Sequence, residues 1–181
     1  MRKLSKRLAA TVATGGLLVA APLAAEGLAG GSLRGFVVGY NASNAQQAIV
    51  EQVPEGETVQ RWTRMVTTQR FTGLAQRTTP AAYARTILNA LPGSCPGAKA
   101  SPVANRTVSG RPAVQFQVDC PRSAGGAPET FILLAIAGQS NMYVKQVAFR
   151  GRIVPADLAW GRSFLSSIVF CTDRDRQPAC R

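Results

Sequence analysis

The sequence contains no histidine, and acidic residues are few: nine Asp and Glu stand against 21 Lys and Arg in 181 residues. Histidine is the usual general base and proton shuttle and a common zinc ligand, so its absence excludes most Ser-His, Cys-His and His-metal chemistry. Aromatic residues make up 7% of the chain, whereas hydrophobic residues make up 46%. That hydrophobic fraction is typical of a globular protein. We therefore expect a folded, basic protein that is not an enzyme.

The N-terminal region has the pattern of a secretory signal peptide. Four basic residues precede an apolar stretch at 8–23, which ends in small residues. The stretch falls short of the ~20 apolar residues that span a bilayer, which favours cleavage over a permanent anchor. Cleavage after Ala25 is preferred, and cleavage after Ala29 is the alternative. We therefore predict a signal peptide at 1–25, one domain at 26–181 without a transmembrane segment, and a periplasmic or secreted location.

The positive charge of the predicted domain comes almost wholly from arginine. Removal of residues 1–25 lowers the formal net charge from +12 to +8, and Lys99 and Lys145 are the only lysines that remain. A GC-rich genome would produce this bias through codon usage, but guanidinium groups also pair well with carboxylates and phosphates. For an exported protein, the charge predicts an anionic envelope component or an acidic protein as partner, not nucleic acid. No metal site or cofactor is predicted.

The four cysteines, Cys95, Cys120, Cys171 and Cys180, form an even set in a chain predicted to be exported, which indicates a disulfide framework. Three pairings are possible. Locality favours Cys95 with Cys120 and Cys171 with Cys180, because each pair closes a short loop between neighbouring elements. The second bridge would hold the polar C-terminal tail against the domain. Zinc binding and redox catalysis are not predicted, since the spacings of 25, 51 and 9 residues between successive cysteines contain no C-x-x-C pair.

Apolar runs and period-2 alternation predict seven strands. They lie at Phe36–Tyr40, Ala48–Val53, Thr58–Phe71, Val103–Val108, Ala113–Asp119, Thr130–Ala137 and Met142–Phe149. Residues 58–71 would also place apolar side chains on one face of a helix, but their β-branched content favours a strand. Ser109 and Gly110 predict a tight hairpin between the fourth and fifth strands.

Two helices are expected from their start and stop signals. Thr79 and Pro80 are typical of a helix N-terminus, and Pro92 and Gly93 predict its end. A second helix begins at Pro155 and is predicted to run to about residue 170. The order is three strands, a helix, four strands and a helix, with tight turns between strands. We therefore predict an α+β domain in which two helices pack on a single antiparallel sheet of six or seven strands.

The candidate ligand-binding residues are Trp62, Arg64, Arg70 and Arg150. The first three belong to the predicted strand 58–71, and period-2 counting places Arg64 on the same face as Trp62 and Arg61 on the opposite face. These side chains could line a basic sheet face that recognises an anion. Tryptophan is, however, also a common core residue whose polar tip reaches the surface. The disulfide cysteines are structural candidates, and no catalytic residue is predicted.

The segment ILLAIAGQSNM at 132–142 resembles the nucleophile block of SGNH-type carbohydrate esterases. That resemblance implies that Ser140 would attack an ester while neighbouring Gly and Asn stabilise the oxyanion. Such enzymes activate the serine with a histidine, which this chain lacks. Gly138–Asn141 are also residues that hairpin turns prefer. A turn is therefore favoured, and an esterase is the alternative.

The run EQVPEGETVQRWTRMVTTQRF at 51–71, followed by a helix and by Cys95 and Cys120, resembles small exported proteobacterial proteins of uncharacterised function. The order of its strands and helices is similar to that of PsbP-like and LpqN-like domains. The resemblance implies an α/β/α sandwich and an exported location, and it implies no catalytic residue. The expected function is non-enzymatic binding of a partner or of an anionic envelope ligand. A structural or stress-protective role in the envelope is a further alternative.

Overall fold

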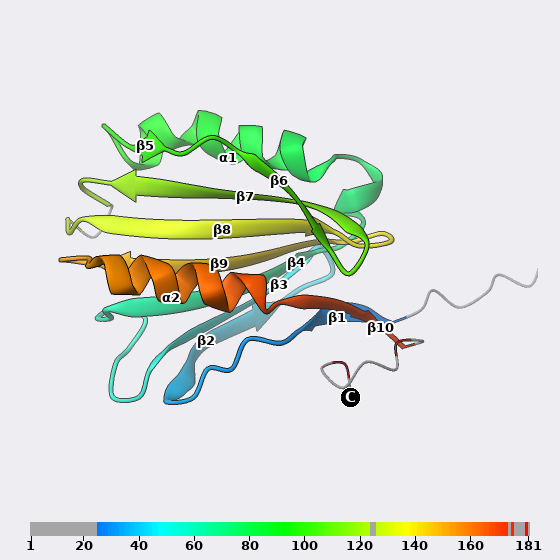
Figure 1. Cartoon of the computed structure of the whole chain (residues 1–181), viewed down its shortest axis with the longest axis horizontal. Coiled ribbons are helices and arrows are strands. Elements are labelled where there is room, and N and C mark those ends of the chain that lie inside the picture. The colour runs from blue at the N-terminus through cyan, green and yellow to red at the C-terminus, as the bar shows by residue number, and fades with distance from the viewer. Residues whose placement is uncertain (1–24, 124–125, 174, 176–179, 181) are drawn as a thin grey trace, which may run out of the picture.

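The computed structural model describes residues 25–123, 126–173, 175 and 180 of the chain, so the predicted signal peptide lies almost entirely outside the described residues. Strands dominate the fold, and two α-helices accompany them (Figure 1). The elements are β1 Glu26–Ala29, β2 Phe36–Ser43, β3 Gln47–Pro54, β4 Arg64–Phe71, α1 Pro80–Ser94, β5 Lys99–Ala100, β6 Ala104–Val108, β7 Arg111–Cys120, β8 Glu129–Ala137, β9 Met142–Arg150, α2 Pro155–Ser166 and β10 Val169–Thr172. Within this described part, neither helix is long and apolar enough to cross a bilayer.

The main sheet has eight strands in the order β2-β3-β4-β9-β8-β7-β5, with β6 also paired to β7. Every pair in it is antiparallel. The α+β class and the antiparallel sheet are thus confirmed, but the predicted six or seven strands are too few. A separate two-stranded sheet joins β1 to β10. The sequence did not predict β1, β5 or β10, because each is four residues or fewer, and β1 and β10 have partners at opposite ends of the domain.

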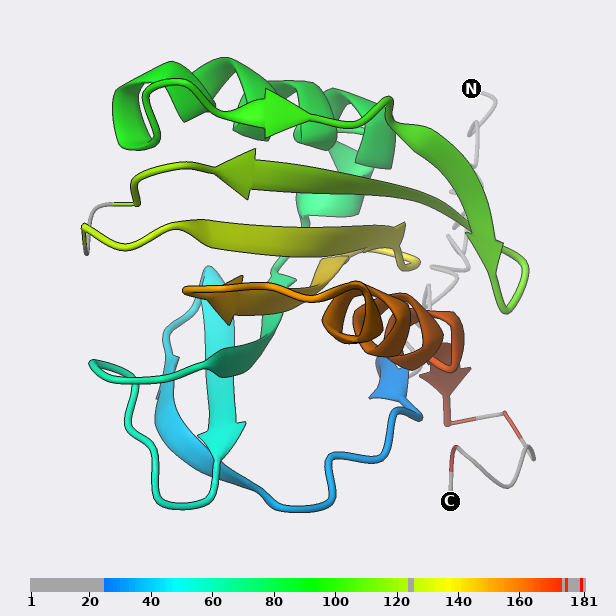
Figure 2. The same ribbon diagram turned by 60° about the vertical axis from the view of Figure 1, so that its left-hand side comes forward.

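The two helices cover opposite faces of the main sheet (Figure 2). α1 packs with Val114, Phe116 and Leu133, whereas the α2 residues Phe164 and Leu165 pack on the other face. Because side chains alternate between faces along a strand, β8 must present apolar groups on both sides. Its nearly continuous apolar sequence is therefore the expected composition of a strand covered twice.

The ends of α1 follow the sequence signals closely. Thr79 Oγ1 accepts a hydrogen bond from the Ala82 N–H at 3.2 Å, and Pro80 occupies the first turn. The helix continues through Pro92 to Ser94, slightly beyond its predicted end. Cys95 then forms a disulfide with Cys120 at the end of β7, with a Cα–Cα distance of 5.8 Å. Both predicted bridges are confirmed, the second joining Cys171 to Cys180.

The predicted extension of the second helix to about residue 170 is wrong, because α2 ends at Ser166 and Phe170 belongs to β10. Ile168 and Phe170 are both buried in the core beneath α2. Their spacing of two residues fits an extended chain, in which alternate side chains share a face. The last apolar residues therefore reach the core from a strand, and β10 is available to pair with β1.

Gly161 allows α2 to lie close to the sheet. A Cβ at this position would lie 3.1 Å from Phe149 Cζ and 3.3 Å from Ile132 Cδ1, and both of these side chains are buried. We predict that Gly161→Ala lowers the free energy of unfolding by about 1–2 kcal/mol through overpacking, despite alanine's higher helix propensity. Urea denaturation measures this change.

Gly93→Ala in α1 is the matched control, since nothing beyond its chain neighbours and the backbone of its own helix lies within 4 Å of its Cβ position. This variant should be neutral or slightly stabilising. An equal gain in stability for both variants would contradict the close packing of α2 on β8 and β9.

Candidate functional site

Trp62 and Arg150 are in contact, but at the edge of the hydrophobic core and not on a free surface. Trp62 is 7% exposed and packs with Val53 and Met65. The Arg150 guanidinium carbon lies 4.1 Å from the centre of the indole ring, and Arg150 Nη2 lies 3.3 Å from Glu129 Oε2. The cation is thus already stacked and paired within the protein, which leaves it little capacity for an external anion.

Arg64 and Arg70 lie towards opposite ends of β4. Arg64 Nη2 is 2.6 Å from Asp157 Oδ1 of α2, and its guanidinium also lies 5.4 Å from the centre of the Trp160 ring. Arg70 is exposed and is opposite Tyr143 in the register of β9. Arg64 and Arg150 line one shared hollow of about 470 Å³. Arg70 is not among the residues that line it.

The predicted strand 58–71 begins only at Arg64, because residues 58–63 form turns and bends. Glu57 organises this loop by accepting hydrogen bonds from the Thr63 N–H and hydroxyl at 2.6 and 2.7 Å. Trp62 therefore packs on the same face of the sheet as α1, although α1 covers a different part of that face. Arg64 lies on the opposite face, where it pairs with Asp157 of α2. The prediction that these two side chains share a face is wrong. Period-2 counting fails here since it assumes an extended chain through the loop.

Ser140 lies in the hairpin turn between β8 and β9, as the turn interpretation predicts. The Ser140 carbonyl accepts a hydrogen bond from the Ala75 N–H at 3.0 Å. The backbone N–H groups of Gln139, Ser140 and Asn141 point to the carboxylate of Glu26. Of the residues that the esterase resemblance assigns to the oxyanion, the Asn141 N–H thus donates to Glu26 and the Gly138 N–H donates to the Asn141 carbonyl at 2.8 Å, so both backbone amides already have an acceptor within the protein.

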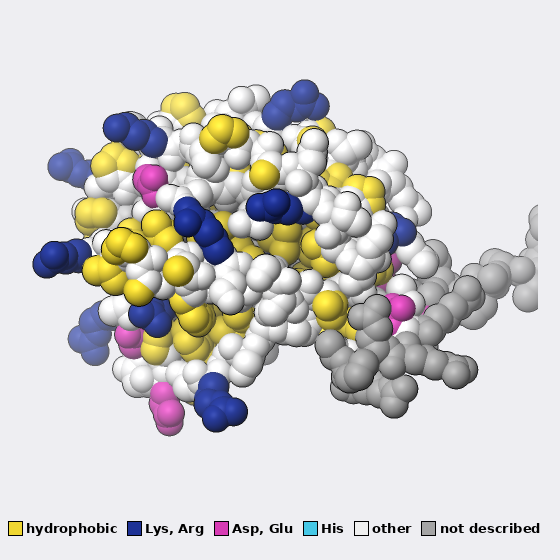
Figure 3. Space-filling view, in the orientation of Figure 1, with side chains coloured by type: hydrophobic (Ala, Val, Ile, Leu, Met, Phe, Trp, Pro, Cys, Tyr) yellow, Lys and Arg dark blue, Asp and Glu magenta, His cyan; other side chains and the backbone are white. Residues whose placement is uncertain are grey.

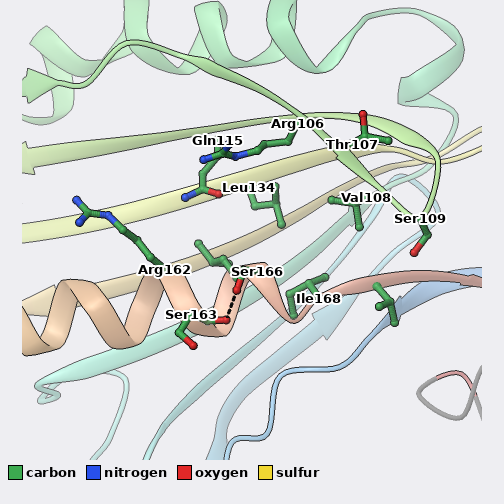
Figure 4. Close-up of a pocket in the computed structure, with 12 residues that line it drawn as sticks. Arg106, Thr107, Val108, Ser109, Gln115, Leu134, Arg162, Ser163, Ser166 and Ile168 are labelled. Atoms are coloured by element: carbon green, nitrogen blue, oxygen red, sulfur yellow. Dashed lines mark hydrogen bonds between the residues drawn. The ribbon is translucent and has the colours of Figure 1, made fainter.

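A groove of about 810 Å³ lies between α2 and the β6–β7 hairpin (Figure 4). α2 packs on β8 and β9, so it leaves the adjoining face of β7 uncovered. Gln115 of β7 and Leu134 of β8 form the floor of the groove. A smaller hollow of about 190 Å³ shares Arg106, Gln115 and Arg162 with this groove and extends it along β7.

Local sequence explains both walls of the groove. Val108 is opposite Arg111, so Ser109 and Gly110 form a two-residue turn, with φ angles of 47° and 76°. Such turns match the twist of paired strands. Ser109 Oγ then accepts a hydrogen bond from the Phe170 N–H at 3.0 Å, which connects the tip of the hairpin to β10. On the other wall, the residues of α2 that face the groove include Arg162, Ser163 and Ser166, on one side of the helix.

The charge of the groove is wholly positive. Arg106 and Arg162 line it, and none of its lining residues is acidic. The ion pairs found among the described residues are Arg64 with Asp157 and Arg150 with Glu129, so neither groove arginine takes part in one. Arg162 Nη2 donates a hydrogen bond to Gln117 Oε1 at 2.9 Å, which orients the guanidinium towards β7. Two exposed cations are thus available to an anion.

The basic side chains gather near one end of the groove. Arg106 and Arg162 lie there with Gln115, whereas Val108 and Ile168 lie towards the hairpin tip, together with the uncharged polar Thr107 and Ser109 (Figure 4). On the same face of the molecule, apolar side chains are visible at the bottom of a hollow and basic side chains at its edge (Figure 3). The groove therefore suits a ligand that has an anionic end and an apolar remainder.

Sequence reasoning missed this groove because its two arginines are far apart in sequence. Arg162 belongs to a helix whose apolar face was recognised, and Arg106 to a strand that was predicted correctly. Only the pairing of β6 with β7 and the position of α2 bring them together. One signal was available: Arg162, Ser163 and Ser166 form a polar side of a helix whose only other polar side chain is Asp157 in its first turn.

No group of three or more Cys, Asp and Glu side chains suited to a metal ion occurs in the ranges that the structure describes. Comparisons with family models and with curated proteins found no match to this chain.

Proposed function

We propose that this protein is an exported, non-enzymatic binding protein whose groove between α2 and the β6–β7 hairpin holds an anionic amphiphile. One observation supports the proposal above the others: Arg106 and Arg162 lie over a partly apolar groove that has no acidic lining residue. The earlier candidates Arg64 and Arg150 have carboxylate partners within the protein. The anionic partner that the composition predicts is thus assigned to a different pair of arginines.

The export of the protein rests on the signal peptide pattern and is supported by the two disulfides. Such bridges persist in oxidising compartments, including the periplasm and the extracellular space. We therefore place the protein in the periplasm or outside the cell. We also propose that its fold is of the PsbP-like type, since helices cover both faces of an antiparallel sheet.

The chemistry of the groove selects the ligand class. A guanidinium group forms two parallel hydrogen bonds with a carboxylate or phosphate, and two such groups favour an anionic head over a neutral one. Leu134, Leu165 and Ile168 line the groove from the core, and their accessible edges would contact an alkyl chain. Burial of each CH₂ group contributes about 0.8 kcal/mol. An alkyl chain with an anionic head would use both parts, whereas a small inorganic anion would use only the first.

Binding of dodecyl phosphate to the mature protein, measured by isothermal titration calorimetry, tests this function. The double variant Arg106→Glu/Arg162→Glu should weaken binding by about 10- to 100-fold or more, since a charge-assisted hydrogen bond contributes about 1.5–3 kcal/mol. Affinity of the unmodified protein should also fall as salt concentration rises. Dodecyltrimethylammonium, which has the same chain and the opposite charge, should bind weakly.

The control variant is Arg77→Glu/Arg85→Glu, which makes the same change in net charge at exposed positions that do not line the groove. It should bind dodecyl phosphate within a few-fold of the unmodified protein. Equal losses in both double variants would mean that net charge, not the groove, attracts the ligand. That result would overturn the proposed function.

A further inference from the structure

The carboxylate of Glu26 occupies a ring of backbone amides in the turn between β8 and β9. Glu26 Oε2 accepts a hydrogen bond from the Gln139 N–H at 2.7 Å. Glu26 Oε1 accepts from the Asn141 N–H at 3.1 Å and from the Ser140 N–H at 3.5 Å. Successive backbone N–H groups that converge in this way form an anion-binding nest. Glu26 is therefore an intramolecular anion held by the turn.

The surroundings show that the nest is shaped for this carboxylate. A Cβ on Gly138 would lie 2.7 and 2.9 Å from the two carboxylate oxygens, so only glycine allows the turn to approach this closely. The Tyr143 hydroxyl donates a hydrogen bond to the backbone carbonyl of Glu26 at 2.8 Å. Both the side chain and the main chain of Glu26 are thus held by the segment that follows β8.

Glu26 is also the first residue of β1, which pairs along its full length with β10. The register runs from Glu26 opposite Thr172 to Ala29 opposite Val169. β10 ends beside the Cys171–Cys180 bridge, so β1 is joined to the part of the chain that this bridge holds. Ala25, the residue before β1, adds one hydrogen bond, because its carbonyl accepts from the Asp173 N–H at 3.0 Å.

We propose that the Ala25–Glu26 peptide bond is cleaved during export, and that Glu26, then the N-terminal residue, holds the β8–β9 turn in place through its carboxylate. This inference rests on the proposed export of the protein. Hydrolysis adds one water molecule across the bond, leaving a carboxylate on Ala25 and an amino group on Glu26. Cleavage here removes only the hydrogen bond from the Asp173 N–H to the Ala25 carbonyl. All four residue pairs between β1 and β10 stay in place.

Cleavage after Ala29, the alternative that the sequence allows, would have a much larger effect. It would remove the whole of β1 and the carboxylate, leaving three amides of the turn without their acceptor. It would also leave the Tyr143 hydroxyl without the Glu26 carbonyl. Buried or partly buried polar groups that lose their partners destabilise a fold. The structure therefore assigns Glu26, not Gly30, as the start of the mature chain.

N-terminal sequencing and intact mass of the protein recovered from the native envelope or medium test the assignment. The expected N-terminus is Glu26, with two disulfides in the mass. An N-terminus at Gly30 would overturn this inference while leaving export intact. A chain that retains Met1 and stays in the cytoplasm would overturn both this inference and the proposed export.

A second experiment tests whether Glu26 holds the turn in the folded, exported protein. Glu26→Ala should lower the melting temperature by about 5 °C or more, and 100 mM acetate should restore part of the loss, because acetate can enter the vacated nest. Chloride at the same ionic strength should not. The exposed Glu55 provides the control, since Glu55→Ala should change neither the melting temperature nor the response to acetate. Equal behaviour of the two variants would show that the nest does not hold Glu26.

Discussion

Replacing Lys145 by methionine is expected to raise the free energy of unfolding at pH 7 by about 1–3 kcal/mol. Lys145 is 9% exposed on the central strand β9, beneath α2. Its Nζ donates a hydrogen bond to Thr68 Oγ1 at 2.6 Å and lies 5.7 Å from the centre of the Phe164 ring. No carboxylate forms an ion pair with it among the described residues. Burial of this charge lowers the pKa of Lys145 from 10.5 to about 8.

The pH dependence of the effect follows from that lowered pKa. Between pH 8 and 10.5 the unfolded chain binds more protons at this lysine than the folded chain does, so the stability of the unmodified protein rises with pH there. Lowering the pKa of Lys145 from 10.5 to about 8 corresponds to about 3 kcal/mol of stability, and loss of the hydrogen bond to Thr68 in the variant offsets part of this gain. The advantage of Lys145→Met is therefore complete below about pH 8 and disappears towards pH 10.5.

Urea denaturation of both proteins from pH 7 to 10.5 measures this difference. Burial raises the pKa of Tyr83 and of Tyr143, but both proteins retain these groups, so their effect cancels in the difference. Lys99→Met removes an exposed lysine and should change stability little at any pH. If Lys145→Met were destabilising at pH 7, the buried ammonium would be contributing to stability, contrary to this account.

Removal of the Cys95–Cys120 bridge is expected to lower the free energy of unfolding by about 3 kcal/mol. The bridge spans 25 positions in sequence and ties the end of α1 to the end of β7. Without it the unfolded chain regains the conformational entropy of an open loop. The double variant Cys95→Ala/Cys120→Ala should therefore melt roughly 6–12 °C lower. Alanine avoids placing new hydroxyl groups at these two buried positions.

The Cys171–Cys180 bridge provides a comparison within the same protein. It spans only nine positions, so its removal should reduce stability by a smaller amount, about 2–3 kcal/mol at most. Thermal melts of Cys95→Ala/Cys120→Ala and of Cys171→Ala/Cys180→Ala under the same conditions show which bridge contributes more to stability. A larger loss from the second bridge would show that strain or local packing, not loop closure, determines the contribution of these disulfides.

Much of the fold could be predicted because its signals are local. The alternation in β7, the apolar run of β8 and the Thr79-Pro80 start of α1 each reflect side chains within a few residues. Both disulfide pairings also follow from locality. By contrast, β1 and β10 depend on each other across the whole domain. A four-residue strand with so distant a partner leaves no periodic pattern long enough to recognise.

The candidate site was less predictable, for a related reason. Composition predicts an anionic partner but does not show which arginines are paired within the protein. Arg64 and Asp157 are 93 positions apart and nonetheless form an ion pair, whereas Arg106 and Arg162 face one groove without one. Which cations remain available is decided by tertiary contacts. Arg64, two residues from Trp62, is neutralised by Asp157, whereas Arg162, two residues from Trp160, forms no ion pair among the described residues.

Titration of the ¹⁵N-labelled protein with dodecyl phosphate, followed by amide chemical shifts, is the most direct test of ligand binding in the groove between α2 and the β6–β7 hairpin. We expect the largest shifts in two segments, residues 106–109 of the β6–β7 hairpin and residues 162–169 of α2 and the start of β10, and at Gln115 between them. Shifts concentrated at Thr63, Arg64 and Arg152, in the hollow at the other end of α2, would contradict this expectation. So would saturation without localised shifts in the groove.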